Sequence, residues 1–336
     1  RMTGLLGGTD SLWSASVQNP ASLTFMGSIY SGGQRVLDIH ATDGGWNSGY
    51  WTTLLPGGVT HVGSESNENW IVDAAHPIVA GLSMGETAEV LARRYGIRRE
   101  EQDRYALESH RRASRATASG RLREEIVPVF LPPEYRETVT DDIGFRSDPD
   151  LDALSRLRPV FDRKSGTVTA GNSSPITDGA AALVLASEER AREAGYPVLG
   201  RIRSWGFAGC DPAAMGLGPA YATPVALRRG GATFRDVKLV EINEAFAAQV
   251  IACERAFASR EFAARELGLP EPIGEFDRSV TNVNGGAIAL GHPVGATGAR
   301  LVLTLCLELA RRDADLGLAT LCVGGGQGAA ILIERA

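Results

Sequence analysis

Residues 282–293 read Asn-Val-Asn-Gly-Gly-Ala-Ile-Ala-Leu-Gly-His-Pro, a glycine-rich stretch that ends on His292 just before a predicted helix. Two further clusters accompany it: Asn243 follows a predicted strand at the start of a helix, and Cys322 ends another strand and is followed by three glycines. Glycine lets the backbone approach a ligand closely. Loops at strand ends are where α/β sheets collect their sites. The sequence therefore predicts that a His, a Cys and an Asn lie in strand-end loops.

Strands and helices alternate around these clusters, which indicates a layered α/β fold in which helices cover a sheet. Apolar periodicity and turn residues set the expected bounds. The predicted strands are Ala180–Ala186, Val198–Phe207, Val237–Ile242, Val280–Val283, Leu318–Val323 and Gly328–Glu334, and the predicted helices are Glu86–Tyr95, Arg99–Ser119, Ser187–Ala194, Thr223–Gly230, Ala245–Ser259 and Gly295–Arg311.

The first quarter of the chain has a different composition. Residues 1–83 hold four of the five Trp but only two of the 34 Lys and Arg, and they show almost no helix pattern. We therefore predict a boundary near residue 83, preceded by short strands and loops. The aromatic stretch 42–51 either forms a carbohydrate-stacking surface or packs as ordinary β structure. The expected strands here are Ser22–Tyr30, Arg35–Ile39, Val59–Val62 and Trp70–Val72.

The overall composition excludes several classes of protein. The chain has 336 residues, of which 43% are hydrophobic and 22% charged, and this excludes a disordered, collagen-like or disulfide-rich chain. A net charge of −6 argues against nucleic acid as a partner. No apolar run is long enough for a membrane span, no signal peptide is visible, and no metal-ligand spacing occurs. We expect a cytoplasmic protein.

The three clusters suit acyl-group chemistry. A Cys thiol with a normal pKa of about 8.5 can exchange protons at neutral pH when a neighbouring His poises it. Backbone N–H groups in a glycine turn can stabilise an enolate or tetrahedral oxyanion. Each cluster also has a structural explanation: Asn is a good helix N-cap, a glycine run makes a tight turn, and a single Cys is usually a buried small hydrophobe.

Residues 84–336 resemble the thiolase family, the CoA-dependent acyltransferases that make or cleave the carbon–carbon bond of 3-ketoacyl-CoA. The resemblance implies a thiolase-like α/β fold, acyl-CoA and CoA as partners, coenzyme A as a substrate with no permanently bound cofactor, and a homodimer or homotetramer. It points to fatty-acid β-oxidation or acetoacetyl-CoA metabolism. Besides the three clusters, the matching stretches are residues 84–89 (MGETAE), 99–103 (REEQD), 157–161 (LRPVF), 166–174 (GTVTAGNSS) and 178–181 (DGAA).

The resemblance also implies roles for single residues. Cys322 resembles the acid/base Cys that deprotonates the acetyl donor or CoA, and His292 resembles the His that activates the nucleophile and lines an oxyanion hole. Asn243 resembles the residue that positions a catalytic water. The N–H of Gly324 would join a second oxyanion hole, and Ala170 and Ser174 fall where the family holds the pantetheine of CoA.

One catalytic element of the family has no counterpart in this sequence. Thiolases need a second, nucleophilic Cys in their N-terminal half, whereas the four Cys here are Cys210, Cys253, Cys306 and Cys322. We therefore expect the N-terminal half to be largely missing and replaced by residues 1–83. On this division, 84–196 is the loop-domain remainder with the end of the first half, and 197–336 is the complete C-terminal domain.

Three functions remain open at this point. The chain is a thiolase-type acyltransferase with impaired catalysis, or a non-catalytic chimeric or truncated product that is at most a CoA-binding remnant. The third alternative is a surface module that binds carbohydrate or a partner through residues 1–83. The truncated core makes the family's oligomers doubtful for this chain.

Overall fold

The computed structural model describes residues 81–131 and 133–336 and, within residues 1–80, the course of six strands. The chain divides into two compact units, Arg1–Met84 and Gly85–Ala336. The predicted strand Trp70–Val72 and the side chains of stretch 42–51 lie outside the described residues. The first unit forms one antiparallel sheet whose strands follow chain order: β1 (Met2–Leu5), β2 (Ser11–Asn19), β3 (Ser22–Ser31), β4 (Gln34–Thr42), β5 (Ser48–Leu55) and β6 (Gly58–Ser64).

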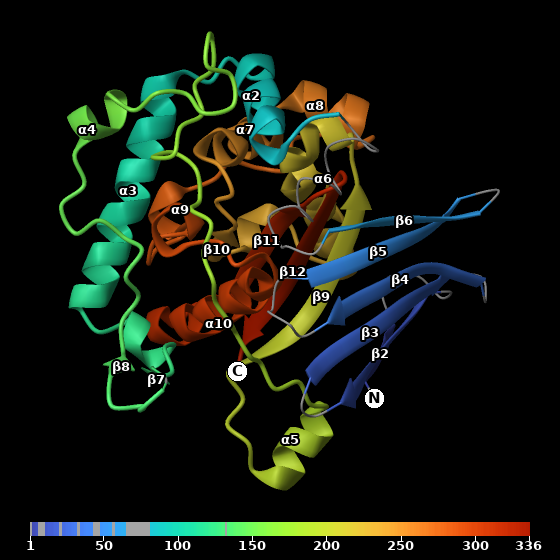
Figure 1. Cartoon of the computed structure of the whole chain (residues 1–336). Helices are drawn as coiled ribbons and strands as arrows, with labels where there is room; N and C mark the ends of the chain where they lie inside the picture. Colours follow the sequence, from blue (N-terminus) through green and yellow to red (C-terminus); the bar gives the residue numbers. More distant parts are fainter. Residues whose placement is uncertain are drawn as a thin grey trace. The chain divides into compact units, whose positions relative to one another are not determined.

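The second unit is built on a four-stranded sheet in the order β10-β11-β12-β9 (Figure 1). Strands β10 and β11 are parallel, whereas β12 runs antiparallel to both of its neighbours. The carboxyl ends of β10 and β11 therefore meet at one edge of the sheet. The strands are β9 (Gly200–Gly209), β10 (Leu239–Ile242), β11 (Leu316–Val323) and β12 (Gln327–Arg335).

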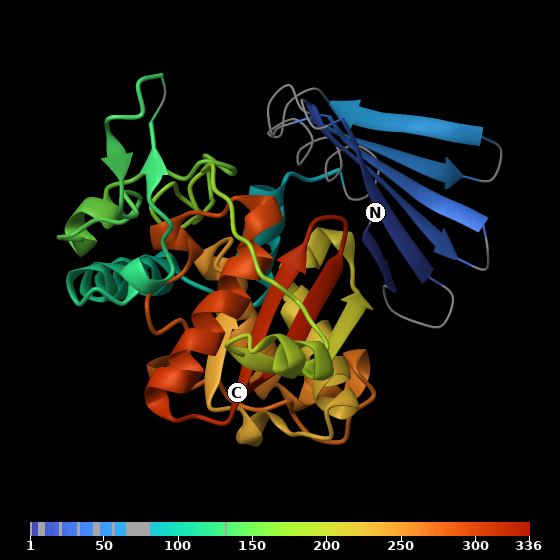
Figure 2. The same ribbon diagram turned by 90° about the horizontal axis from the view of Figure 1, so that it is seen from below.

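Helices cover both faces of this sheet (Figures 1 and 2). On one face, α10 (Val294–Arg312) contributes Leu301, Leu305, Cys306 and Leu309 to a core with Leu239, Ala319 and Ile333. On the other face lies α6 (Gly218–Arg229), which contacts β9 and β12. A Cβ at Gly206 of β9 would lie 2.7 Å from the backbone N of Ala226, so glycine is what lets α6 come this close.

A second layer of helices packs over the loops at the sheet edge. Helix α3 (Arg99–Ala118) contacts both α7 (Ala247–Ala258) and α9 (Ala287–Leu290), and its buried face includes Tyr105 and Ser109. Five of the six predicted helices agree with the observed ones to within two residues at each end, whereas α6 begins at Gly218, five residues before the predicted Thr223. The remaining elements are α2 (Met84–Arg94), α4 (Leu151–Ser155), α5 (Glu188–Ala194), α8 (Arg260–Glu266), the 3-10 turns η2 (Leu122–Glu124), η3 (Pro212–Leu217), η4 (Phe234–Asp236) and η5 (Arg278–Val280), and the hairpin β7 (Val129–Phe130) and β8 (Thr138–Val139).

Two predicted strands are wrong. Residues 180–186 form no strand, and Val184 and Leu185 are 90% and 76% exposed. An apolar run becomes a buried strand only if a neighbour pairs with its backbone, and none of the described strands does so. The predicted strand Val280–Val283 is reduced to one bridge between Thr281 and Val240, because η5 precedes it and Asn282 turns to a φ of 45°.

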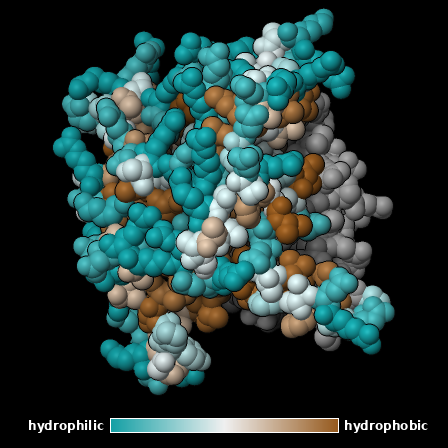
Figure 3. Space-filling model, turned by 90° about the vertical axis from the view of Figure 1, so that its left-hand side faces the viewer, coloured by the Kyte–Doolittle hydropathy of each residue, from teal (hydrophilic) through white to brown (hydrophobic). Residues whose placement is uncertain are grey.

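Part of the sheet remains uncovered on the side opposite α6. Residues Ser204 and Gly206 of β9 are buried, and the alternating residues Trp205 and Phe207 are 46% and 49% exposed. Figure 3 shows one face of the molecule that is mostly hydrophilic, with apolar groups gathered in several separate places. Trp205 and Phe207 are two residues apart on the same face of β9, and exposed apolar side chains that lie together mark a surface suited to further packing.

Candidate functional site

The sheet brings Asn243 and Cys322 to the same edge. Ile242 at the end of β10 pairs with Thr320 of β11, and the backbone N–H of Asn243 donates to the Thr320 carbonyl at 2.9 Å. Cys322 comes two residues after Thr320 on the same strand. The parallel pairing of β10 and β11 therefore places both predicted residues at the carboxyl edge.

His292 joins this edge through its ring nitrogens. Its Nε2 lies 3.2 Å from Asn243 Nδ2, and its Nδ1 lies 2.7 Å from Thr297 Oγ1 in the first turn of α10. Asn243 is fully buried, and its Oδ1 has no hydrogen-bond partner among the described residues. Burial, aided by the positive charge of Arg300, lowers the pKa of His292 to about 4. The imidazole is therefore neutral at pH 7.

The Cys322 thiol is buried at this edge of the sheet. It is 7% exposed, and burial raises its pKa to about 12. Among the contacts of residues 81–131 and 133–336, its Sγ has no hydrogen bond to His292 or Asn243. Desolvation penalises the thiolate, and the poising of this thiol by His292 stays a prediction. Cys322 is a protonated thiol at neutral pH.

The three glycines after Cys322 form the turn between β11 and β12. Gly325 and Gly326 have φ angles of 86°, in the left-handed region that favours glycine. The Gly326 carbonyl accepts a hydrogen bond from the Cys210 N–H at 2.7 Å, which holds the turn against the loop after β9. Gly324 lies at the start of this turn, two residues from Cys322.

The segment with Ala170 and Ser174 is docked beside the Asn243 loop. The carboxylate of Glu89 in α2 accepts the N–H groups of Thr167 and Val168, each at 2.8 Å. At the other end of the segment, the Ser174 N–H donates to the Ala245 carbonyl at 2.9 Å. Ser174 thus lies close to the Asn243 loop, and Ala170 is exposed.

Sequence reasoning missed the residue that joins these loops, Glu244. Its carboxylate, 1% exposed, accepts hydrogen bonds from the Tyr105 hydroxyl at 3.1 Å, the Ser109 hydroxyl at 2.6 Å, Asn282 Nδ2 at 2.8 Å and the Ile288 N–H at 3.3 Å. The sequence held one indication of this role: Glu244 directly follows Asn243 at the end of a predicted buried strand.

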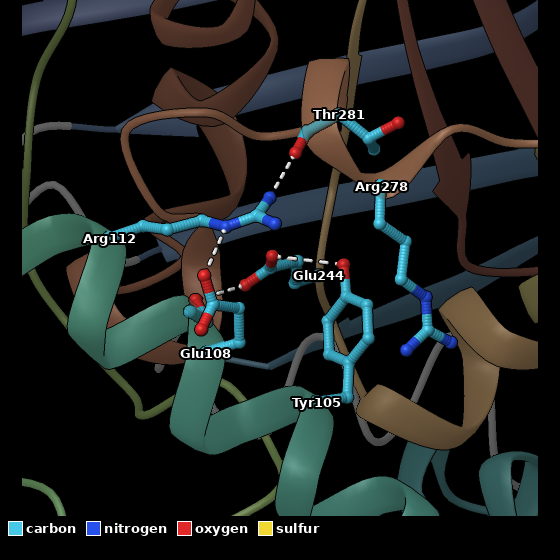
Figure 4. A pocket seen from close by; sticks show the side chains of 7 residues that line it. Tyr105, Glu108, Arg112, Glu244, Arg278 and Thr281 are labelled. Atoms are coloured by element: carbon cyan, nitrogen blue, oxygen red, sulfur yellow. Dashed lines mark hydrogen bonds and ion pairs between the residues drawn. The ribbon is translucent and has the colours of Figure 1, made fainter.

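A small pocket lies beside Glu244 (Figure 4). Arg112 spans it from α3, donating to Glu108 and to the Thr281 carbonyl. Arg278 also lines the pocket, and its guanidinium lies over the Tyr105 ring, 5.4 Å from the centroid. Both cations are already engaged, since Arg278 pairs with Glu254 at 2.5 Å. The pocket connects α3 to the Asn243 loop.

The other three thiols have the opposite of the electrostatics that a nucleophile needs. Burial raises the pKa of Cys210 and of Cys306 to about 11, and it raises that of Cys253 well above the ordinary value. A nucleophilic Cys needs a lowered pKa.

Within the described part of the chain, no cluster of His, Cys, Asp and Glu could hold a metal ion. Among the described helices, none has the length and apolar composition that crossing a bilayer requires.

Two family models match this chain. The model for the thiolase C-terminal domain matches residues 196–335, and the model for the thiolase N-terminal domain matches residues 48–189. The second match begins before residue 84, where the predicted resemblance starts.

Curated relatives and solved structures agree with these matches. The 3-ketoacyl-CoA thiolases of Shewanella sp. (strain ANA-3) and Yersinia pestis (strain Pestoides F) are both 49% identical over 255 residues. These residues are 76% of this chain and 58% of each relative, so the chain spans less than two thirds of their length. The Bacillus anthracis acetyl-CoA acetyltransferase is similar with a TM-score of 0.71 and 41% identity, covering 84% of this chain and 66% of that one. The human mitochondrial 3-ketoacyl-CoA thiolase in complex with CoA gives a TM-score of 0.68 and 36% identity, covering 85% and 67%.

Proposed function

The chain belongs to the thiolase family, and on that basis we propose that it binds acyl-CoA and CoA and carries the proton-transfer half of 3-ketoacyl-CoA chemistry. The observation that carries this proposal is the edge shared by Asn243, His292 and Cys322, where the Asn and His are hydrogen-bonded at 3.2 Å. The curated relatives are 3-ketoacyl-CoA thiolases, which supports this substrate class.

The proposed step is proton transfer between the Cys322 thiol and C2 of the enolate of an acyl thioester. The thiol gives its proton to C2, the C2–C1 double bond of the enolate supplies the electron pair of the new C–H bond, and the negative charge moves from the thioester oxygen to the Cys322 sulfur. The N–H of Gly324 would stabilise the enolate oxygen. In the reverse step, the thiolate so formed takes a proton from C2 and the enolate returns. Because burial favours the thiol, this residue serves most readily as the acid.

His292 supplies the complementary function at the same edge. A neutral imidazole with its lone pair on Nε2 can take a proton from CoA or from a nucleophile, and the resulting imidazolium can then donate to an oxyanion. Its low pKa keeps it neutral before the reaction. Asn243 Oδ1, which is buried and has no hydrogen-bond partner in the described part of the chain, would hold a water between His292 and Cys322.

We further propose that these 336 residues do not transfer acyl groups by themselves. The covalent step needs a thiolate that attacks the thioester carbon, and burial raises the pKa of all four thiols. Loss of a covalent nucleophile costs on the order of 10⁶ in rate.

The docked segment with Ala170 and Ser174 would hold the pantetheine of CoA. In this proposal, residues 84–196 are the loop-domain remainder with the end of the first half, and residues 197–336 are the C-terminal domain.

Two assays on the full chain test the proposal. The first follows deuterium incorporation into the methyl group of acetyl-CoA in D₂O by mass spectrometry, and the second follows loss of acetoacetyl-CoA in the presence of CoA. Matched variants are Cys322→Ala, which removes the proposed acid, and Cys210→Ser, which changes another thiol near the same turn.

We expect the wild type and Cys210→Ser to exchange deuterium and Cys322→Ala to stop at the uncatalysed rate. We expect neither the wild type nor Cys210→Ser to consume acetoacetyl-CoA faster than Cys322→Ala does. Equal exchange by wild type and Cys322→Ala refutes the proton-transfer function. Thiolysis by the wild type above the Cys322→Ala rate refutes the proposed impairment.

A further inference from the structure

Thr297 is the one residue of helix α10 that touches His292 by a described hydrogen bond. It lies five residues after the His, in the first turn of the helix, and is 1% exposed. Its Oγ1 is 2.7 Å from His292 Nδ1 and 3.0 Å from the Pro293 carbonyl oxygen. The hydroxyl therefore links the imidazole to the backbone at the start of α10.

A hydroxyl has a single proton, so Thr297 can donate to only one of these two partners, and the direction of one hydrogen bond fixes that of the other. The Pro293 carbonyl can only accept, and the hydroxyl reaches it with the i−4 geometry that Thr adopts in helices. If Thr297 donates its proton there, its lone pairs accept from His292, and Nδ1 must then carry a hydrogen. A neutral imidazole with Nδ1–H has its lone pair on Nε2.

The contact on the other side of the ring agrees with this assignment. Nε2 faces Asn243 Nδ2, a donor, at 3.2 Å. The Nδ1–H form makes this an N–H donating to a lone pair, whereas an Nε2–H form would set two N–H groups against each other. One direction of donation therefore satisfies all three contacts, from Asn243 through His292 and Thr297 to the Pro293 carbonyl.

We propose that Thr297 is a positioning residue that holds His292 in the Nδ1–H tautomer, so that the lone pair of Nε2 points to the edge with Asn243 and Cys322. This inference rests on the proposed function, because Nε2 is the atom proposed to take a proton. Partners that orient an imidazole in this way fix both its tautomer and its ring plane. Thr297 does not touch the reacting atoms.

The test reads the tautomer directly by NMR. The full chain is labelled with ¹⁵N-histidine, and long-range ¹H–¹⁵N correlation spectra at pH 7 distinguish protonated from unprotonated ring nitrogens. The chain has five His, and the His292→Asn variant identifies the His292 signals. Thr297→Val removes the hydroxyl with almost no change of shape, and Thr297→Ser keeps it.

Thr304→Val is the matched control. Thr304 lies on the same helix, is 2% exposed, and donates to Glu125 at 2.5 Å instead of contacting His292. It therefore shows how the same Thr-to-Val change in α10 affects the spectra and the exchange rate when no contact with the imidazole is lost. Each variant is also measured for deuterium exchange into acetyl-CoA.

We expect the wild type, Thr297→Ser and Thr304→Val to show one tautomer with hydrogen on Nδ1. Thr297→Val should show a mixture of both tautomers and about tenfold slower exchange, since a lost hydrogen bond of about 1.4 kcal/mol is a factor of ten. Hydrogen on Nε2 in the wild type, or an unchanged tautomer in Thr297→Val, overturns the proposal. The spectra need no substrate, so this result is independent of whether the proposed proton transfer occurs.

Discussion

Replacement of Glu244 by Gln should strongly destabilise the unit Gly85–Ala336, although the two side chains have the same shape. Four donors converge on the Glu244 carboxylate, from α3, the Asn282 loop and α9. The amide of Gln keeps one oxygen for the Tyr105 hydroxyl and Asn282. Its NH₂ group replaces the oxygen that accepts from Ser109 and from the Ile288 N–H, so the Ile288 N–H meets another donor.

The magnitude follows from these contacts. Hydrogen bonds to a charged group contribute about 1.5–3 kcal/mol, and a buried donor left unsatisfied costs about 1–3 kcal/mol. One lost charge-assisted bond and one unsatisfied N–H therefore give a loss of about 3 kcal/mol in the free energy of unfolding. The Gln side chain has no room to move away from these donors, because the site is tightly packed: a Cβ added at Gly286 would overlap the Glu244 carboxylate.

Glu108→Gln is the control with the same chemical change in the same pocket. The Glu108 side chain is 42% exposed and pairs with Arg112 at 2.9 Å and Arg115 at 3.2 Å. Exposed pairs of this kind contribute at most about 1 kcal/mol. Both variants carry one negative charge less, so the difference between them isolates burial and the hydrogen-bond network.

The assay is urea unfolding of the full chain at pH 7, followed by circular dichroism at 222 nm. All described helices begin at Met84 or later, so this signal reports the second unit. A shift of the Glu244→Gln midpoint no larger than that of Glu108→Gln would refute the reasoning. Equal midpoints would mean that the network around Glu244 adds nothing beyond an exposed ion pair.

Three further predictions concern protonation, thiol exposure and close packing. The pKa of His292 is about 6.5 in the unfolded chain and about 4 in the folded one, so the folded state binds fewer protons between these pH values. The free energy of unfolding should therefore fall by up to about 3 kcal/mol as the pH falls from 6.5 to 4. Urea midpoints measured across this range should show that His292→Asn lacks this part of the pH dependence. Iodoacetamide at pH 7.5 should label Cys210 first and slowly, because the other three thiols are buried; peptide mass spectrometry that finds another Cys labelled equally fast contradicts the burial pattern. Gly328→Ala should lower the free energy of unfolding by at least about 2 kcal/mol, because its Cβ would overlap the Gly218 backbone. Gly298→Ala in α10 should raise the free energy of unfolding by up to about 1 kcal/mol, because its Cβ meets nothing closer than 3.8 Å and alanine favours a helix more than glycine does. Thermal unfolding of the two variants tests both predictions.

Much of the fold could be predicted because local patterns report burial. The helix predicted at Arg99–Ser119 is observed at Arg99–Ala118, and the strand predicted at Leu318–Val323 is observed at Leu316–Val323. In both, the spacing of apolar side chains matches the face that the element buries. Ala180–Ala186 has an equally apolar pattern, yet it is not a strand, because a strand also needs a neighbour that its own residues do not specify.

The sequence by itself determined which residue types stand at the sheet edge: Asn243 after β10, His292 before α10 and Cys322 at the end of β11. Only the tertiary structure decided how they are protonated and what holds them. Burial makes Cys322 a thiol and His292 a neutral imidazole, and the contact with Thr297 selects a ring nitrogen. These properties depend on desolvation and on distances between segments far apart in the chain, which no local pattern records.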